Sequence, residues 1–289
     1  MRLAFAITLF LAASAARAQT TEIQTARSSA MGGAFRAMAY DNSAVDLNPA
    51  GMVQIKKADF AASYLRSVED PATYAIMVAI ADSLTNNGAT GFAFEYRKVK
   101  IKVPGGTTLN AETQRYVTAG AYPIVPQYLS AGFSGKYVQS KVTGEKGKKI
   151  FSSDFGLHSR PVQMLSISAG FDNLINGGEP EAPRTITAGA ALLPFRWLAV
   201  SGDVWQDLAT DPDEDHLGWA AGAQWSPFQQ IALRGGVYEE AVAEEFRERI
   251  WTAGFGLLSE TGSIDYAMRL TDKDSETLSH HVTVSVLVF

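Results

Sequence analysis

The sequence predicts an all-β protein: a transmembrane antiparallel up-and-down β-barrel of about fourteen strands with a short N-terminal plug segment. Three observations predict it. Residues 58–289 divide into segments with period-2 alternation, the connections alternate between short and long, and an export signal precedes them. The expected units are a signal peptide over 1–18, a plug segment over 19–57 and an outer-membrane barrel over 58–289.

The N-terminus has the three parts of a secretory signal. A basic start at Arg2 precedes an apolar stretch over 3–13, and Ala-Arg-Ala at 16–18 has the pattern of a cleavage site. The alternative, a buried helix, would need a continuing amphipathic pattern, but the polar run 19–24 follows at once. We therefore expect cleavage near Ala18 and localisation in the outer membrane of a Gram-negative-type cell.

The segment that follows the signal has a compact sequence. The pair Gly32-Gly33 allows close packing of the backbone, and Asp41 with its polar neighbours favours a turn. Pro49 holds Asn48 extended, and Gly51 is expected to free the turn into the first strand. Such a peptide fits inside a barrel as a plug. The alternative is a disordered periplasmic tail.

Beyond residue 57, hydrophobic residues recur at every second position, as in half-buried strands. Phe92, Phe94 and Tyr96, for example, alternate with small or charged residues. Most segments have about 9–11 residues, the length that a tilted strand needs to cross a bilayer. The fourteen expected strands lie near 58–65, 73–81, 90–99, 112–121, 127–139, 150–158, 163–172, 184–192, 197–206, 216–225, 230–238, 249–257, 263–271 and 279–289.

The connections between these segments are of two alternating kinds. Every second one is short and contains Pro or similar turn residues, whereas the intervening ones are longer and polar. Outer-membrane barrels have short periplasmic turns and longer outer loops, and a soluble β-sandwich has no reason for such alternation. The short connections are 122–126, 159–162, 193–196 and 226–229; the long ones are 141–149, 173–183, 207–215, 239–248 and 272–279.

The last strand alternates β-branched residues and ends on an aromatic residue. It resembles the assembly signal that barrel-assembly machinery reads, carried here by Leu287 and Phe289, and that machinery is an expected partner. Phe289 falls on the face of Thr283 and Ser285, so the match requires a bulge near Leu287. The alternative is the edge strand of a secreted sandwich.

Charges of both signs recur on the strand face opposite to the aromatic residues. Each cation would cost about 2–4 kcal/mol if it faced lipid at the midplane, so these side chains are expected to face the lumen. They either line a polar channel or form an ion-pair network that holds the plug. The residues are Glu95, Arg97, Lys136, Asp154, Asp172, Asp203, Arg234, Asp265 and Arg269.

Composition and motifs predict no enzyme, metal or cofactor. The chain has 289 residues, a net charge of −5 and no Cys, so thiolate chemistry is excluded and no basic tract marks a nucleic-acid partner. His158 and Asp154 are the one near pair, but residues i and i+4 of a strand lie about 13 Å apart. The acidic run 211–215 lacks the Gly of a calcium loop. The lysines at 146, 148 and 149 are expected in an exposed loop, with contact to anionic lipid as the alternative.

The segment over 29–52 resembles the opening of FadL-like outer-membrane transporters, a superfamily that includes the shorter PorV/PorQ-type proteins. The shared residues are Gly-Gly-Ala-Phe at 32–35, a turn with Asp and Ser-Ala at 41–44, and Asn-Pro-Ala-Gly at 48–51. The resemblance implies a fourteen-stranded barrel with this segment inside. The chain is considerably shorter than the fatty-acid transporters, which favours the shorter branch.

The resemblance implies two functions of different classes. The first is passive transport of hydrophobic, fatty-acid-like small molecules across the outer membrane. In this case the plug blocks the lumen, and the ligand leaves sideways into the bilayer through a Gly-broken wall. The second is a non-transporting docking or assembly component for protein secretion, as in the PorV type. The implied partners are outer-membrane lipid and either a hydrophobic small molecule or a secreted protein.

Overall fold

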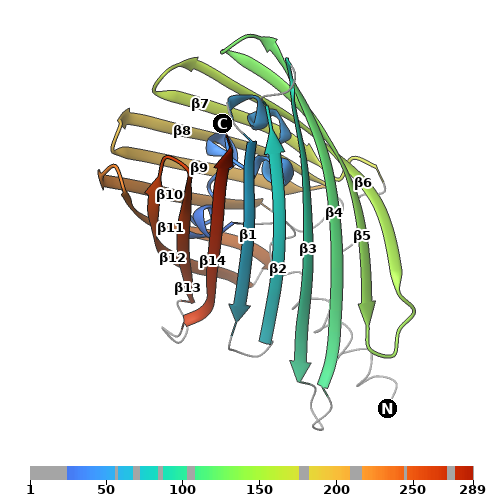
Figure 1. The fold of residues 1–289 in the computed structure, drawn as a ribbon. Helices are drawn as coiled ribbons and strands as arrows, with labels where there is room; N and C mark the ends of the chain where they lie inside the picture. The colour runs from blue at the N-terminus through green and yellow to red at the C-terminus, as the bar shows by residue number, and fades with distance from the viewer. Residues whose placement is uncertain are drawn as a thin grey trace.

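The chain forms a closed barrel of fourteen antiparallel strands, in which strands adjacent in the sequence are adjacent in the wall (Figure 1). The computed structural model describes residues 25–55, 58–67, 72–83, 87–102, 108–175, 182–208, 217–243, 246–271 and 277–288. The strands are β1 (Ala58–Ser67), β2 (Ala72–Asp82), β3 (Ala89–Lys102), β4 (Thr108–Val125), β5 (Leu129–Val142), β6 (Lys148–Val162), β7 (Leu165–Asp172), β8 (Thr185–Phe195), β9 (Leu198–Asp207), β10 (Leu217–Phe228), β11 (Ile231–Ala243), β12 (Phe246–Ser259), β13 (Gly262–Thr271) and β14 (Thr277–Val288). β1 closes the barrel by pairing with β14.

The predicted all-β fold class and all fourteen expected strands are confirmed. The four short Pro-containing connections differ from the prediction, because β4, β6, β8 and β10 continue into them. In each case the pairing register shifts next to the Pro, as between Pro123 and Val125. Pro lacks an amide hydrogen, so the strand passes it with a local irregularity instead of ending there.

The predicted long connection over 239–248 is wrong, because β11 continues to Ala243 and β12 begins at Phe246. Polar composition suggests a loop at these positions. A strand that extends beyond the bilayer, however, needs no apolar face, so its sequence resembles a loop. The connection over 141–149 is likewise shorter than predicted, since β5 ends at Val142 and β6 begins at Lys148.

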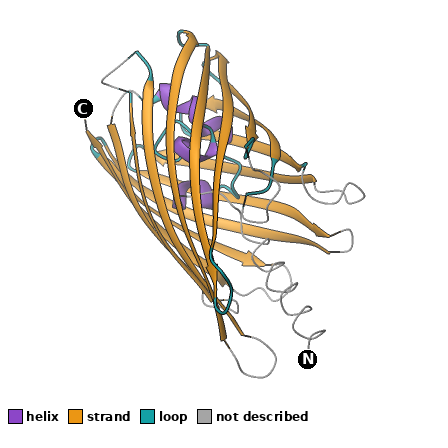
Figure 2. Cartoon of the chain, turned by 90° about the vertical axis from the view of Figure 1, so that its right-hand side faces the viewer, coloured by secondary structure: helices purple, strands orange, loops and turns teal. Residues whose placement is uncertain are grey.

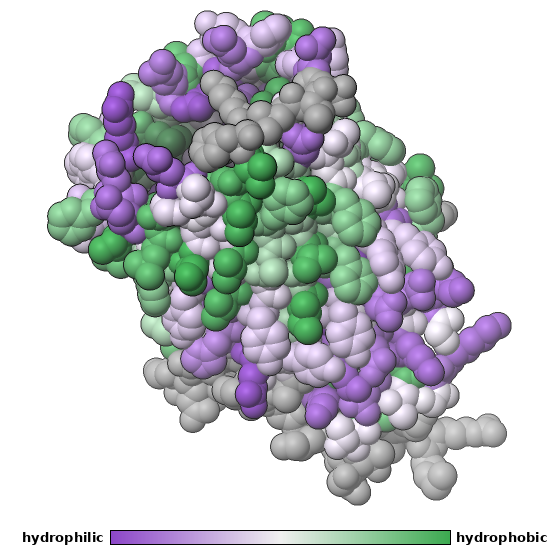
Figure 3. Space-filling model, in the orientation of Figure 1, coloured by the Kyte–Doolittle hydropathy of each residue, from purple (hydrophilic) through white to green (hydrophobic). Residues whose placement is uncertain are grey.

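Two rows of aromatic side chains lie on the outer surface. One row, near the short turns, includes Tyr122, Tyr128 and Trp197, which are 47–62% exposed. The other lies toward the long connections and includes Tyr64 on β1 and Tyr74 on β2. Between the rows the visible face is a band of hydrophobic side chains (Figure 3).

Residues 25–55, called the N-terminal segment below, lie inside the barrel (Figure 2). The segment contains four short helical elements: α2 (Ala26–Ala30), η1 (Arg36–Met38), α3 (Ala44–Leu47) and η2 (Pro49–Gln54). They lie in the part of the barrel nearer the end of β14 (Figure 1). No helix in the described ranges combines the length and the hydrophobicity that would let it span a membrane.

Glycines allow the segment to pack closely. Gly32 and Gly33 have φ of 67° and 79°, in the left-handed region that favours glycine. The expected turn at Gly51 is wrong, because Gly51 lies within η2 and is separated from β1 by residues 52–57. A Cβ at Gly51 would overlap the Ala39 carbonyl oxygen. Glycine at this position therefore serves a close approach of two backbones within the segment.

The C-terminal strand pairs with β1 without interruption. Leu287 lies opposite Asp59 in a continuous register, so the bulge expected near Leu287 is absent and its side chain lies on the inner face with Ser285. Phe289 lies outside the described residues, as do the signal peptide, its cleavage site and the remainder of the expected plug over 19–24 and 56–57.

Candidate functional site

Arg36 of η1 connects the N-terminal segment to two strands of the wall. Its guanidinium donates to Asp172 Oδ2 on β7 at 2.7 Å and to the Leu47 carbonyl oxygen at 2.6 Å. The backbone amides of Phe35 and Arg36 donate to Asp203 Oδ2 on β9 at 2.8 and 2.9 Å. Arg36 is only 5% exposed. Charge-assisted hydrogen bonds, which are stronger than neutral ones, therefore hold the middle of the segment.

Asp46 of α3 is the centre of a second buried network. Arg115 Nη1 on β4 lies 3.1 Å from Asp46 Oδ2, and Lys136 Nζ on β5 lies 3.4 Å from its other oxygen. Lys136 also pairs with Asp154 Oδ2 on β6 at 2.7 Å, and Ser134 donates to the same oxygen. Two cations therefore balance two carboxylates, which limits the cost of burying them.

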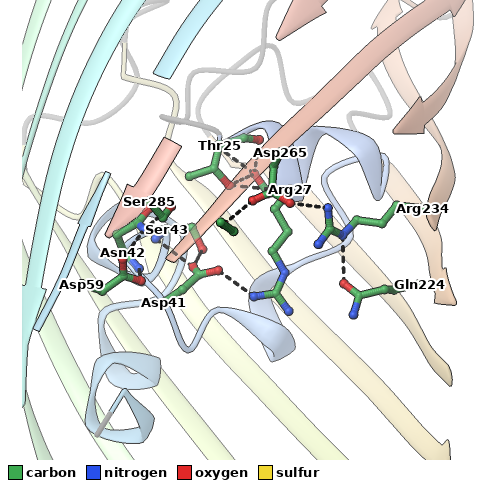
Figure 4. Close-up of polar contacts among 12 residues, drawn as sticks. Thr25, Arg27, Asp41, Asn42, Ser43, Asp59, Gln224, Arg234, Asp265 and Ser285 are labelled. Carbon is green, nitrogen blue, oxygen red and sulfur yellow. Dashed lines mark hydrogen bonds and ion pairs between the residues drawn. The ribbon is translucent and has the colours of Figure 1, made fainter. Parts of the chain in front are cut away.

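A third polar group lies near the short turns, around a cavity of about 370 Å³ (Figure 4). Arg27 Nη1 of α2 pairs with Asp41 Oδ2 at 3.0 Å. The amide and side chain of Asn42 both donate to the Asp59 carboxylate on β1 at 3.0 Å. Burial alone would lower the pKa of the Arg27 guanidinium, but Asp41 raises it above its usual value. Arg27 therefore stays charged and holds the segment at this mouth.

The wall of the same cavity carries its own ion pair. Arg234 Nη1 on β11 lies 2.5 Å from Asp265 Oδ1 on β13, and Arg234 Nε donates to Gln224 at 2.9 Å. Figure 4 shows these side chains beside Arg27 and Thr25. The cavity thus lies between paired charges of the segment and paired charges of the wall.

Asn48 caps η2 and binds the wall. Its side-chain oxygen accepts from the Ala50 amide at 3.3 Å, and its Nδ2 donates to the Leu157 carbonyl oxygen on β6 at 3.2 Å. Asn48 has an extended backbone, as Pro49 requires of the residue before it, and Pro49 is the first residue of η2. The motif begins a helix and does not lead directly into β1.

Replacing Asn48 with Leu is expected to remove the cap and leave the Leu157 carbonyl oxygen without this donor, at a cost of about 1–3 kcal/mol. Proteinase K should then cut within 25–51 more readily, while unheated gel migration still reports a folded barrel. Pro49→Gly should increase cleavage less, because it removes only the fixed φ. Wild-type protease resistance in both variants would contradict the assignment of this motif as an anchor.

The centre of the segment is apolar. Met31, Phe35, Met38, Leu47 and Met52 are at most 1% exposed. They pack in one cluster with small and medium side chains of the wall, among them Met77, Ala79, Ala93 and Val117. The interior therefore combines an apolar centre with ionic contacts at its edges.

The other charges predicted to face the lumen also lie on the inner face. Glu95 Oε1 and Arg97 Nε pair with each other at 2.6 Å on β3, and Arg269 donates to Ser29 Oγ of the segment at 2.9 Å. Together with the pairs above, these contacts favour the ion-pair alternative over a solvated channel lining. In the described ranges no group of His, Asp or Glu has the arrangement of a metal site.

Sequence reasoning missed five charged residues of these networks: Arg27, Arg36, Asp46, Asp59 and Arg115. Arg115 shares the inner face of its strand with the buried Val117, so alternation alone could have identified it. Arg36 and Asp46 lie in a segment without strand periodicity. No sequence pattern separates them there from ordinary surface charges.

The pairing between β6 and β7 leaves the first part of β6 without a partner strand on that side. β6 pairs with β7 only from Phe155 to Val162, although β6 begins at Lys148. The connection after β7 fills part of this edge, where the Leu174 amide donates to the Ser153 carbonyl oxygen at 2.8 Å and Ser152 Oγ donates to the Ile175 carbonyl oxygen. The surrounding apolar side chains are exposed: Phe151 54%, Phe171 42%, Leu174 39% and Ile175 48%.

Comparisons with known proteins identify the fold. No family model and no curated protein matches the sequence. The Pseudomonas putida toluene transporter TodX matches with a TM-score of 0.67 and 12% identity, over 93% of this chain and 98% of that one. The monoaromatic hydrocarbon channel CymD matches with a TM-score of 0.64 and 13% identity, over 90% of this chain and 95% of that one. A Pseudomonas aeruginosa FadL homologue matches with a TM-score of 0.56 and 10% identity, over 89% of this chain and 95% of that one.

Identities of 10–13% show a shared fold. The chain has the architecture of FadL-like barrels, as the resemblance at 29–52 implies. None of the three neighbours is described as an enzyme.

Proposed function

We propose that the chain is a FadL-like protein that lets small hydrophobic molecules cross the outer membrane passively. The observation that carries the proposal is the match of nearly the whole barrel to a toluene transporter and to a monoaromatic hydrocarbon channel. The aromatic rows and the apolar band between them support a position in the outer membrane. The N-terminal segment is the plug that keeps the lumen from being an open pore.

The incomplete β6–β7 pairing supports a sideways exit for such molecules. Within a fully paired stretch, a lateral opening would break a continuous row of backbone hydrogen bonds, whereas few such bonds hold the edge of β6 before Phe155. Phe151, Leu174 and Ile175 provide an apolar path from this edge into the bilayer. The ligand class that fits is a small hydrocarbon without a charged group.

The main test compares uptake of labelled toluene with uptake of a labelled hydrophilic sugar. Cells that lack other hydrocarbon channels should take up toluene faster when they express this protein, and their sugar uptake should not change. Equal toluene uptake with and without the protein would end the proposal. A matching rise in sugar uptake would identify an open porin instead.

Ile175→Asp tests the exit. A carboxylate at the apolar rim should slow toluene uptake about fivefold, which corresponds to about 1 kcal/mol of added barrier. Leu208→Asp is the matched control, because Leu208 is equally exposed, at 47%, and lies just beyond β9 at the same end of the barrel. Equal uptake by the two variants would exclude this exit and leave the transport proposal in place.

The docking alternative makes a different prediction. A PorV-type component would retain a secreted protein during purification in mild detergent and would show no toluene uptake. None of the three neighbours reported above is described as a docking component. Fractionation into the outer membrane, with heat-modifiable gel migration, tests the location that both functions require.

A further inference from the structure

Four lysines lie on the outer face at one end of β3–β6 and are called the basic patch below. Lys98 and Lys100 share the face of the exposed Phe92 on β3. Lys141 shares the face of Phe133 on β5, and Lys149 that of Phe151 on β6. Lys100, Lys141 and Lys149 are exposed, so an external ligand can reach their ammonium groups.

The strand register places these lysines side by side. Glu112 of β4 lies opposite Lys98 of β3 and opposite Lys141 of β5. Lys149 of β6 lies opposite Gln139 of β5, two residues from Lys141. With neighbouring strands about 4.8 Å apart, the patch is about 15 Å wide. This width suits a head group with more than one anionic centre.

The patch lies just beyond an aromatic row. Lys98 follows Tyr96 by two residues on the same face, and Lys149 precedes Phe151 by two. The Tyr96 ring lies 6.0 Å from that of Tyr74, and the rings of Tyr116 and Tyr137 lie 6.3 Å apart. Aromatic rows of this kind mark the boundary between hydrocarbon and head groups. The lysines are therefore at head-group level, at the end with the long connections.

The charge here contrasts with that of the chain. Lys98 pairs with Glu112, whose Oε1 lies 2.6 Å from its Nζ. The patch, its neighbour Glu112 and the turn over 143–147 together contain five lysines and two glutamates, a net charge of +3 in a protein of −5. Hydrophilic side chains gather at this end of β3–β6 in Figure 3.

We propose that the basic patch binds the phosphate groups of a phosphorylated glycolipid in the outer leaflet. This rests on the proposed location in the outer membrane, where the long connections face outward. The lysines point away from the lumen and adjoin the apolar band. A ligand with phosphate groups and acyl chains can therefore contact the lysines and the apolar band at the same time. A free phosphate would contact the lysines alone. Lysine acts on phosphate as a point charge and tolerates several head-group geometries.

The test uses Lys100→Gln/Lys149→Gln, which removes two exposed lysines on opposite sides of the patch. Arg66→Gln/Arg196→Gln is the matched control, because it removes two exposed cations elsewhere on the surface. Purified protein is titrated with a bis-phosphorylated acylated glucosamine disaccharide, its dephosphorylated form, phosphatidylglycerol and inorganic phosphate. Bound ligand is counted by native mass spectrometry.

The lysine variant should bind the bis-phosphorylated glycolipid about tenfold more weakly than wild type, and the control variant should bind it as wild type does. The proposal is overturned if the lysine variant binds the glycolipid as tightly as the control variant does. It is also overturned if wild type binds the dephosphorylated form as tightly as the bis-phosphorylated one. Equal affinity for phosphatidylglycerol or for inorganic phosphate overturns the assignment to a glycolipid. The toluene assay and membrane fractionation report separately on the proposed function, so failure of one is distinguishable from failure of the other.

Discussion

Replacing Arg36 with Met is expected to release the N-terminal segment from the wall while the barrel stays folded. Methionine fills a similar volume but leaves the buried Asp172 carboxylate without its cation and the Leu47 carbonyl oxygen without its donor. Removing one partner of a buried pair typically costs about 3–5 kcal/mol. The strands pair with one another and not with Arg36. The lost free energy therefore weakens the binding of the segment to the wall and leaves the barrel folded.

The measurement is proteinase K digestion followed by mass spectrometry of the fragments. The Arg36→Met variant should be cut within 25–55 at concentrations that leave wild type intact, and its unheated gel migration should still be that of a barrel. Arg36→Lys should be intermediate, because one ammonium can reach Asp172 but cannot replace the forked guanidinium. Arg66→Met, at an exposed position on β1, should behave as wild type. Wild-type resistance of Arg36→Met would show that the other two networks hold the segment alone.

The strands could be predicted from the sequence because their signal is local. Alternation in the run around Phe92 assigns one face to lipid and the other to the lumen, and it correctly places Glu95 and Arg97 on the inner face. Boundaries were less predictable. Pro123 marks a register shift and not a strand end, and the polar residues near Ala243 belong to a strand that extends beyond the bilayer.

The partners of the inner charges could not be predicted, because they are far apart in the sequence. Arg36 and Asp172 are 136 residues apart, and periodicity carries no information about such pairs. Asp203 binds backbone amides of the segment, which any sequence would offer. The Asn48-Pro49 motif indicates a fixed local conformation. Its contact with Leu157 depends on the curvature of the wall, which no local pattern encodes.

The Lys136–Asp154 pair is expected to show strong coupling in a double-mutant cycle. Lys136→Met leaves Asp154 buried at 1% exposure without a cation, and it also takes one of two cations from Asp46. We expect a loss of about 3–5 kcal/mol in the free energy of unfolding. Asp154→Asn keeps an acceptor for Ser134 and removes the charge. In the double variant, the loss should fall short of the sum of the single losses by about 1–3 kcal/mol.

Urea unfolding in lipid vesicles, followed by Trp fluorescence, measures these energies. The control cycle uses Arg249 and Glu239, which lie 3.0 Å apart with the Arg249 side chain 47% exposed. Solvent screens that pair, so its coupling should stay below about 1 kcal/mol. Equal couplings in the two cycles would mean that water reaches Asp154 in the folded barrel. The inner network would then line a hydrated passage and would not hold the segment in place.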